Sequence, residues 1–261
     1  MMPDFATLVL RQERHGVVRL TLNRPHRHNA LDGVMIRELA AAAELLAAAP
    51  DLRAVILDAA GTSFCAGGDL DWMKQQSSGG RAARTLEATA LARMLRLVDE
   101  LPQLVTALVA GAAYGGGVGL ASVCDIVIAA PDVRFQLTET RLGLIPAVIA
   151  PFLHRRVGPA ALRRFGLHGA AIDAGEARAV GLVSEVVPAD QLEAAAQRHV
   201  GQVLACAPGA VADAKRLFRD LAAAAAGEAE TIAALVRRWE NAEAEAGIAA
   251  FFSKRPSPWQ D

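Results

Sequence analysis

Two glycine-rich segments could bring backbone amides to a ligand, because each follows a short apolar run that is typical of a buried strand. They cover residues 61–70 (GTSFCAGGDL) and 111–120 (GAAYGGGVGL). Small residues at a strand end let a ligand approach the backbone N–H groups, and a helix that begins there adds positive potential. Two such N–H groups directed at one oxygen form an oxyanion hole, whereas either segment alone could equally be a tight turn.

Glu139 lies close to the end of the strand expected at 135–137. Because Asp132, Thr138 and Thr140 cluster around it, residue type alone favours a solvated carboxylate at a strand end. The sequence lacks the motifs of a dinucleotide-binding turn, a phosphate-binding loop and a zinc protease, and it shows no set of metal ligands.

Strand and helix patterns alternate up to about residue 188, and only helical patterns follow. Strands are expected at 5–10, 17–22, 54–57, 104–110, 125–129, 135–137 and 181–187, with a loop at 61–68. Helices are expected at 32–49, 81–101, 116–123, 160–166, 174–180, 190–206, 208–226 and 228–250. Asp32 is the expected N-cap of the first of these helices, and Asp69 is expected to cap a helix that follows it. This order predicts an α/β region followed by a helical region.

Four motifs in register resemble the crotonase (enoyl-CoA hydratase/isomerase) superfamily. They lie at residues 23–31 (NRP, then NAL), 64–70 (FCAGGDL), 115–126 (GGGVGL, then CDI) and 139–146 (E, then LGLIP). The resemblance runs from about residue 8 to the C-terminus. It implies a spiral of ββα units over residues 1–189 that holds an acyl-CoA site, and a helical oligomerisation region over 190–261.

The same resemblance implies roles for individual residues. The amides of Gly68 and Gly116 would form the oxyanion hole, and Glu139 would be an acid/base group. The implied contacts with substrate and coenzyme A are Ala66, Gly68, Asp69, Leu70, Asp71, Gly116, His26, His28 and Lys254. A solvated turn is the alternative for the two histidines. For Lys254 the alternatives are a solvated tail or a contact with the CoA phosphates of a neighbouring subunit.

Position 119 departs from the pattern of the two-glutamate hydratases in this superfamily. In those enzymes one glutamate lies three residues after the second oxyanion glycine, where this chain has Gly119. The other glutamate corresponds to Glu139, which is present. One of the two acid/base groups is therefore absent, and this puts simple two-glutamate hydration in doubt.

Residues 67–73, 117–119 and 141–151 resemble most the bacterial hydratases of branched, carboxylated glutaconyl-CoA esters. Those esters are 3-methylglutaconyl-CoA of leucine breakdown and isohexenylglutaconyl-CoA of terpenoid breakdown. We therefore expect an enoyl-CoA hydratase, a hydro-lyase, that forms a homotrimer or a dimer of trimers. It would need no metal and no cofactor apart from the coenzyme A of its substrate. Two alternatives stay open: a Δ3,Δ2-enoyl-CoA isomerase that uses one glutamate, and a non-catalytic or RNA-binding member of the fold.

The composition limits the class of partner. The 261 residues carry a net charge of −1, which leaves no basic field for nucleic acid or an anionic membrane. Residues 104–124 are uncharged, but their glycines and flanking residues argue against a membrane span. Three cysteines without a CxxC pair argue against a disulfide framework or a zinc site, and the start shows no signal peptide. These features predict a cytoplasmic protein.

Overall fold

Two β-sheets carry the fold in the computed structural model, which describes residues 4–223, 228–256 and 258–259. The six-stranded sheet contains, in spatial order, β1 (Leu8–Arg14), β2 (Val17–Leu22), β3 (Ala54–Ala59), β5 (Leu104–Val109), β7 (Ile126–Ala129) and β10 (Glu185–Val186). The four-stranded sheet contains β4 (Ser63–Cys65), β6 (Ala112–Tyr114), β8 (Arg134–Gln136) and β9 (Ile172–Asp173). Only the β1–β2 and β8–β9 pairs are antiparallel among these strands.

The chain repeats one path from the large sheet to the small sheet and then into a helix. It runs from β3 to β4, from β5 to β6 and from β7 to β8, and helical segments follow each pair. The helices of this part are α1 (Gly33–Ala47), α2 (Leu70–Ser78), α3 (Arg81–Asp99), α4 (Gly116–Ser122), α5 (Ala150–His168) and α6 (Ala174–Ala179). Short 3₁₀ turns lie at η1 (Pro25–Arg27), η2 (Glu139–Leu142) and η3 (Ala189–Gln191). This repetition confirms the expected α/β class. Because β4, β6 and β8 are parallel neighbours in the small sheet, their carboxyl ends lie side by side.

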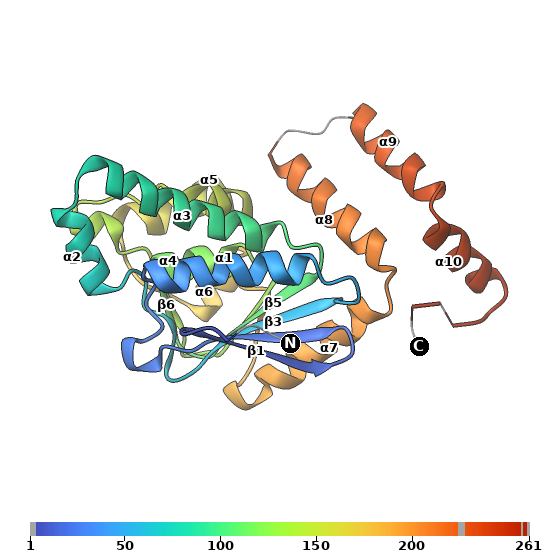
Figure 1. The fold of residues 1–261 in the computed structure, drawn as a ribbon, viewed down its shortest axis with the longest axis horizontal. Coiled ribbons are helices and arrows are strands. Elements are labelled where there is room, and N and C mark those ends of the chain that lie inside the picture. The colour runs from blue at the N-terminus through green and yellow to red at the C-terminus, as the bar shows by residue number, and fades with distance from the viewer. Residues whose placement is uncertain (1–3, 224–227, 257, 260–261) are drawn as a thin grey trace.

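The large sheet is covered on both faces, which explains the apolar runs in its central strands. Helices α1 and α7 (Leu192–Leu204) lie on opposite sides of these strands (Figure 1). Helix α7 packs on β3, β5 and β7. A parallel strand buried on both faces has no polar side to present, so its sequence does not alternate. The expected helix at 32–49 is confirmed as α1, with Asp32 capping the Met35 amide at 2.8 Å.

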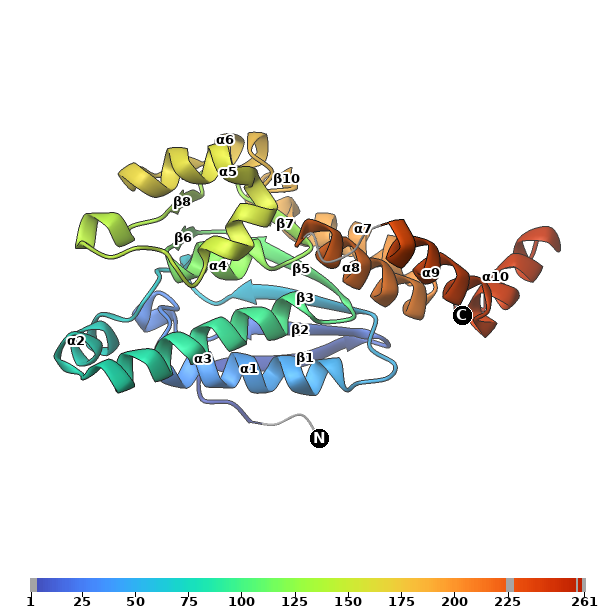
Figure 2. The same ribbon diagram turned by 90° about the horizontal axis from the view of Figure 1, so that it is seen from above.

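The last three helices project from the rest of the chain, as Figures 1 and 2 both show. They are α8 (Pro208–Ala222), α9 (Glu228–Trp239) and α10 (Ala242–Phe252). Helix α8 has no buried residue, whereas α7 has five. The expected helix at 208–226 extends beyond the described residues, and the single helix expected at 228–250 is two helices. The division at 189/190 and the assembly into trimers stay predictions.

Four further sequence-based boundaries are wrong, and strand pairing explains three of them. The loop expected at 61–68 contains β4, a three-residue strand that exists because it pairs with β6. The first strand begins at Leu8 instead of residue 5 and runs to Arg14, as far as β2 offers partners. Helix α5 begins ten residues before the expected helix and is interrupted at Gly158, where φ is +74°. Of the strand expected at 181–187, only β10 pairs with β7.

The uncharged stretch 104–124 is divided between β5, β6 and α4. No helix among the described residues is long and apolar enough to cross a membrane. Cys65 and Cys124 are buried, and burial raises the pKa of each thiol to about 12. These two cysteines are therefore small core residues, as their sequence context predicts.

Candidate active site

The two glycine-rich segments meet where β4 and β6 end. Gly67 has a φ of +89°, and a Cβ atom at Gly67 would lie 3.1 Å from the carbonyl oxygen of Tyr114. A Cβ atom at Gly115 would lie 3.9 Å from the Cα of Gly67. A side chain at either position would push the two turns apart, so glycine permits this approach. The juxtaposition predicted from the sequence is therefore present.

The Gly68 amide is positioned by a short parallel contact with Leu31. The Leu31 amide donates to the Gly67 carbonyl at 2.7 Å, and the Asp69 amide donates to the Leu31 carbonyl at 2.8 Å. Peptide groups alternate in direction along an extended chain, so the N–H of Gly68 points away from Leu31. It is thereby left available for an acceptor on the other side.

The Gly116 amide has no acceptor inside its own helix, because Gly116 is the first residue of α4. A Cβ atom at Gly116 would lie 2.8 Å from Cδ1 of Leu31. The side chain of Leu31 therefore lies against one candidate oxyanion glycine, while its backbone is bridged to the other, Gly68. One residue thus ties the two halves of the candidate oxyanion hole together.

Glu139 lies beside this meeting point. It opens the turn η2, and its Oε1 atom is 3.1 Å from the position of a Cβ atom on Gly115. Its other oxygen, Oε2, is buried and has no hydrogen-bond partner among the described residues. Burial raises the pKa of the Glu139 carboxyl above its ordinary value, and hydrogen bonds from the backbone of Glu139 and Thr138 only partly oppose that rise. A half-buried carboxyl with one unpartnered oxygen is suited to accept or give a proton.

The helical turn of α4 that follows Gly115 has apolar surroundings. A Cβ atom at Gly119 would lie 2.5 Å from Cγ2 of Ile149 and 3.7 Å from Cδ1 of Leu95. Ile149 and Leu95 are both buried. The place where two-glutamate hydratases are expected to carry a second acid is thus filled by hydrocarbon, and Glu139 is the carboxylate that remains.

The histidine-containing loop lies along the first glycine-rich segment. The Ala66 amide donates to the carbonyl oxygen of His28 at 3.0 Å, and Nδ1 of His28 lies 3.1 Å from the Ser63 hydroxyl oxygen. The side chains of His26 and His28 are exposed. Their contact with coenzyme A stays a prediction.

Asp69, Leu70 and Asp71 have different surroundings. Asp69 is only 4% exposed, and its Oδ1 accepts hydrogen bonds from the amides of Asp71 at 2.9 Å and Trp72 at 3.2 Å, which confirms the expected cap. Leu70 is 72% exposed, and Asp71 forms an exposed ion pair with Arg27 at 2.8 Å. Any substrate contact of Asp69 would therefore involve its backbone, because its side chain is already engaged.

Lys254 follows α10, which lies at the opposite end of the molecule from α2 in both views (Figures 1 and 2). A single chain therefore does not bring this lysine to the glycine-rich turns. Its role toward a neighbouring subunit stays a prediction.

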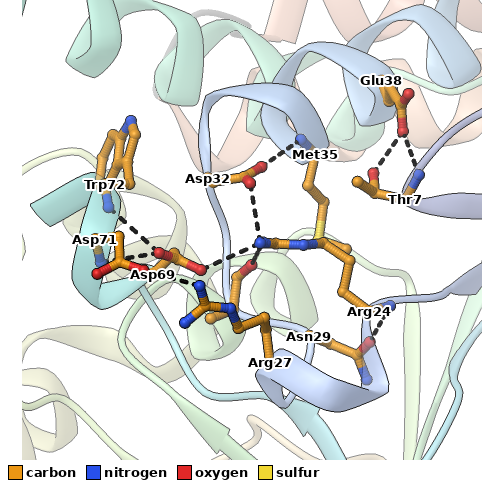
Figure 3. A network of polar contacts seen from close by, with 11 residues as sticks. Thr7, Arg24, Arg27, Asn29, Asp32, Met35, Glu38, Asp69, Asp71 and Trp72 are labelled. Atoms are coloured by element: carbon orange, nitrogen blue, oxygen red, sulfur yellow. Dashed lines mark hydrogen bonds and ion pairs between the residues drawn. The ribbon is translucent and has the colours of Figure 1, made fainter.

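Sequence reasoning assigned no role to Arg24, Leu31 or Ile149. Arg24 lies in the motif at residues 23–31, at the centre of the polar network in Figure 3. A charged residue between a strand end and a proline was the available signal for Arg24. The contacts of Leu31 and Ile149 join segments far apart in the chain, so no local sequence pattern predicts them.

Similarity to known proteins decides the family. A model of the enoyl-CoA hydratase/isomerase family matches residues 12–261. The chain belongs to this family. The crystal structure of an enoyl-CoA hydratase from Shewanella pealeana is 34% identical, with a TM-score of 0.93, over 98% of this chain and 96% of that one. Pseudomonas aeruginosa AtuE is 39% identical, with a TM-score of 0.90, over 98% of this chain and 100% of that one.

Among the curated relatives is the 2,3-dehydroadipyl-CoA hydratase of Escherichia coli. It is 33% identical over 254 residues, which are 95% of this chain and 96% of the relative. These relatives support enoyl-CoA hydratase activity at the level of the general reaction, and an acyl-CoA thioester substrate is consistent with the family. No group of three or more His, Cys, Asp or Glu residues in the described part of the chain is arranged to hold a metal ion.

Proposed function

We propose that this family member is an enoyl-CoA hydratase in which Glu139 alone handles protons. The carrying observation is the contrast around the glycine-rich turns. Glu139 offers a buried, unpartnered oxygen there, while Gly119 is packed against Ile149. The site therefore has one proton acceptor, Glu139, and one place for a carbonyl oxygen, between the amides of Gly68 and Gly116.

In the proposed reaction the thioester oxygen accepts hydrogen bonds from the amides of Gly68 and Gly116. Water adds to Cβ of the enoyl group, and the electrons of the double bond move toward that oxygen. Amides held in place before the reaction stabilise this charge without having to reorganise. Glu139 takes a proton from the attacking water and returns a proton to Cα. The product thus gains a hydroxyl at Cβ and a hydrogen at Cα.

The raised pKa of Glu139 supports both halves of this cycle. Its ordinary value would make it a weak base toward water and a strong acid afterwards. Burial destabilises the ionised form, which brings the affinity for a proton closer to that needed near neutral pH. The same group can then accept and return the proton.

We further propose a branched or carboxylated acyl group of the methylglutaconyl type. Support comes from the likeness of residues 67–73, 117–119 and 141–151 to that class, and from the Escherichia coli relative, whose name gives a dicarboxylic acyl group. The test compares kcat/KM for 3-methylglutaconyl-CoA and crotonyl-CoA. We expect the carboxylated ester to be hydrated faster, and equal rates would overturn this choice of substrate.

An isomerase is the second candidate, because moving a double bond from Δ3 to Δ2 needs only one carboxylate. Loss of the enoyl-thioester absorbance band from a 2-enoyl-CoA supports the hydratase. Appearance of that band from a 3-enoyl-CoA supports the isomerase. The RNA-binding alternative has the net charge of −1 against it, and a salt-sensitive shift of RNA in a gel would revive it.

The localisation, the assembly and the cofactor requirement of the protein are proposals as well. We propose a cytoplasmic homotrimer or dimer of trimers that needs no cofactor beyond the coenzyme A of its substrate. Large apolar side chains exposed on the last helices support association; they are Phe218, Leu221, Ile232, Leu235 and Val236. Light scattering of the purified protein measures the mass of the assembly.

A further inference from the structure

Arg24 joins the starts of two helices on either side of the Gly68 turn. Its Nη2 atom lies 3.1 Å from Oδ2 of Asp32 and 3.2 Å from Oδ2 of Asp69 (Figure 3). Asp32 caps α1, and Asp69 caps α2. The guanidinium therefore connects two caps that lie 37 positions apart in the sequence, which an uncharged side chain of the same length could not do.

The same side chain also holds the backbone that carries Leu31. Nη1 of Arg24 donates to the carbonyl oxygen of Ala30 at 2.7 Å, and the Arg24 amide donates to Oδ1 of Asn29 at 2.8 Å. Asn29 in turn donates to the carbonyl oxygens of Ala60 and Ser63, at 2.8 and 2.9 Å. Residues 29–32 are thus fixed to the strand β4 region from which the first glycine-rich turn emerges.

Arg24 therefore contacts the chain next to Gly68 at two places. It binds the carbonyl oxygen of Ala30, which precedes the residue bridged to Gly68, Leu31, and it pairs with Asp69, which follows Gly68 in the sequence. The Arg24 side chain is 13% exposed, so its contacts are held in a partly desolvated place. Burial alone would raise the pKa of Asp69, yet the amides of Trp72 and Asp71 and the charge of Arg24 hold it below its ordinary value.

We propose that Arg24 is a positioning residue that sets the direction of the Gly68 amide in the oxyanion hole. It acts through Ala30 and Asp69 and is not proposed to touch the substrate. The inference rests on the proposed function, because Gly68 must polarise a thioester for its direction to matter. Loss of Arg24 would let the turn shift, and an amide displaced by a fraction of an ångström stabilises the developing charge less well.

The test compares Arg24→Met and Arg24→Lys with Arg19→Met. Arg19 is the matched control because it is equally enclosed by carboxylates, at 2.6 Å from Asp58 and 2.7 Å from Glu193, but lies away from the glycine-rich turns. Both methionine variants should lower Tm. Only Arg24→Met should also lower kcat, by roughly 10- to 100-fold, with little change in KM. Arg24→Lys, which keeps the charge but lacks the planar fork, should fall between wild type and Arg24→Met.

A spectroscopic readout separates positioning from general loss of stability. In Glu139→Gln protein, where turnover is slow, the infrared carbonyl stretch of a bound enoyl-CoA carrying a ¹³C-labelled thioester reports polarisation by the amides. Adding Arg24→Met should move this stretch toward its value in free solution, and adding Arg19→Met should not. If Arg24→Met does not fold, Arg24→Lys provides the same comparison.

Two results overturn the inference: an unchanged kcat and carbonyl stretch in the Arg24 variants, or an equal loss of kcat in Arg19→Met. The proposed function fails in a different way, when wild type and Glu139→Gln hydrate enoyl-CoA at the same rate. A slow Glu139→Gln enzyme with an unaffected Arg24→Met enzyme contradicts this inference alone.

Discussion

Asp69 and Glu139 are two enclosed carboxylates in the segments that contain Gly67 and Gly115 or lie next to them, and their hydrogen-bonding surroundings are opposite. Asp69 accepts hydrogen bonds from two backbone amides and from Arg24. Glu139 keeps one buried oxygen without a partner among the described residues. Correspondingly, the pKa of Asp69 is lowered despite its burial, and burial raises the pKa of Glu139.

The difference separates a structural carboxylate from a chemical one. A carboxylate whose oxygens are satisfied stabilises the fold and is poorly placed to accept a proton. A carboxylate that is desolvated and unsatisfied destabilises the fold when ionised and accepts a proton more readily. The two side chains should therefore respond in opposite ways to substitution and to pH.

The largest expected effect is on turnover by Glu139→Gln. We expect kcat to fall by roughly 10² to 10⁴, the range for loss of a general acid/base, while acyl-CoA binding persists. Because the amide has no charge to desolvate, Tm at neutral pH should stay the same or rise. Stopped-flow absorbance and calorimetry measure the two quantities. The control is Glu100→Gln, which removes an exposed ion pair with Arg96 and should match wild type. Full activity in Glu139→Gln would contradict the role of Glu139 as the acid/base group.

The next effect tests the apolar side of the site through Gly119→Glu. The new side chain would collide with Ile149, so we expect a loss of about 1–3 kcal/mol from overpacking and no gain in rate. Combining it with Ile149→Ala should recover part of the stability by making room. Thermal unfolding measures the stability of both variants. A stable Gly119→Glu enzyme that is faster than wild type would contradict the proposal that Glu139 alone handles protons.

A smaller effect is expected on stability from Asp69→Ala. Removing an N-cap costs about 0.5–2 kcal/mol, and here Arg24 also loses a partner. Because the folded pKa of Asp69 is below its ordinary value, its stabilisation is present above that value and is lost as pH falls through the lowered pKa. Urea unfolding should show a wild-type advantage at pH 7 that shrinks in acid. An advantage that grows in acid would be the opposite sign and would disprove the linkage.

Much of this contrast was predictable, because motifs and caps are local. The positions of the glycine-rich turns, the Asp32 cap and the Asp69 cap follow from residue type and spacing, whereas Glu139 was singled out only by the family resemblance. The packing of Ile149 over Gly119 and the reach of Arg24 to Asp69 do not, because each joins segments brought together only by the spiral. The strand β4 was missed for the same reason, since pairing with β6 rather than residue preference creates it.

The pH dependence of kcat/KM for hydration tests the central claim, that one buried carboxylate performs the proton chemistry. Glu139 must be ionised to take a proton from water, so the rate should fall on the acid side with a single ionisation. Its midpoint should lie above the ordinary glutamate value of 4.5, because burial raises the pKa. The residual rate of Glu139→Gln should lack this acid limb. A Glu139→Gln enzyme that keeps the wild-type limb would place the base on another residue and contradict the account.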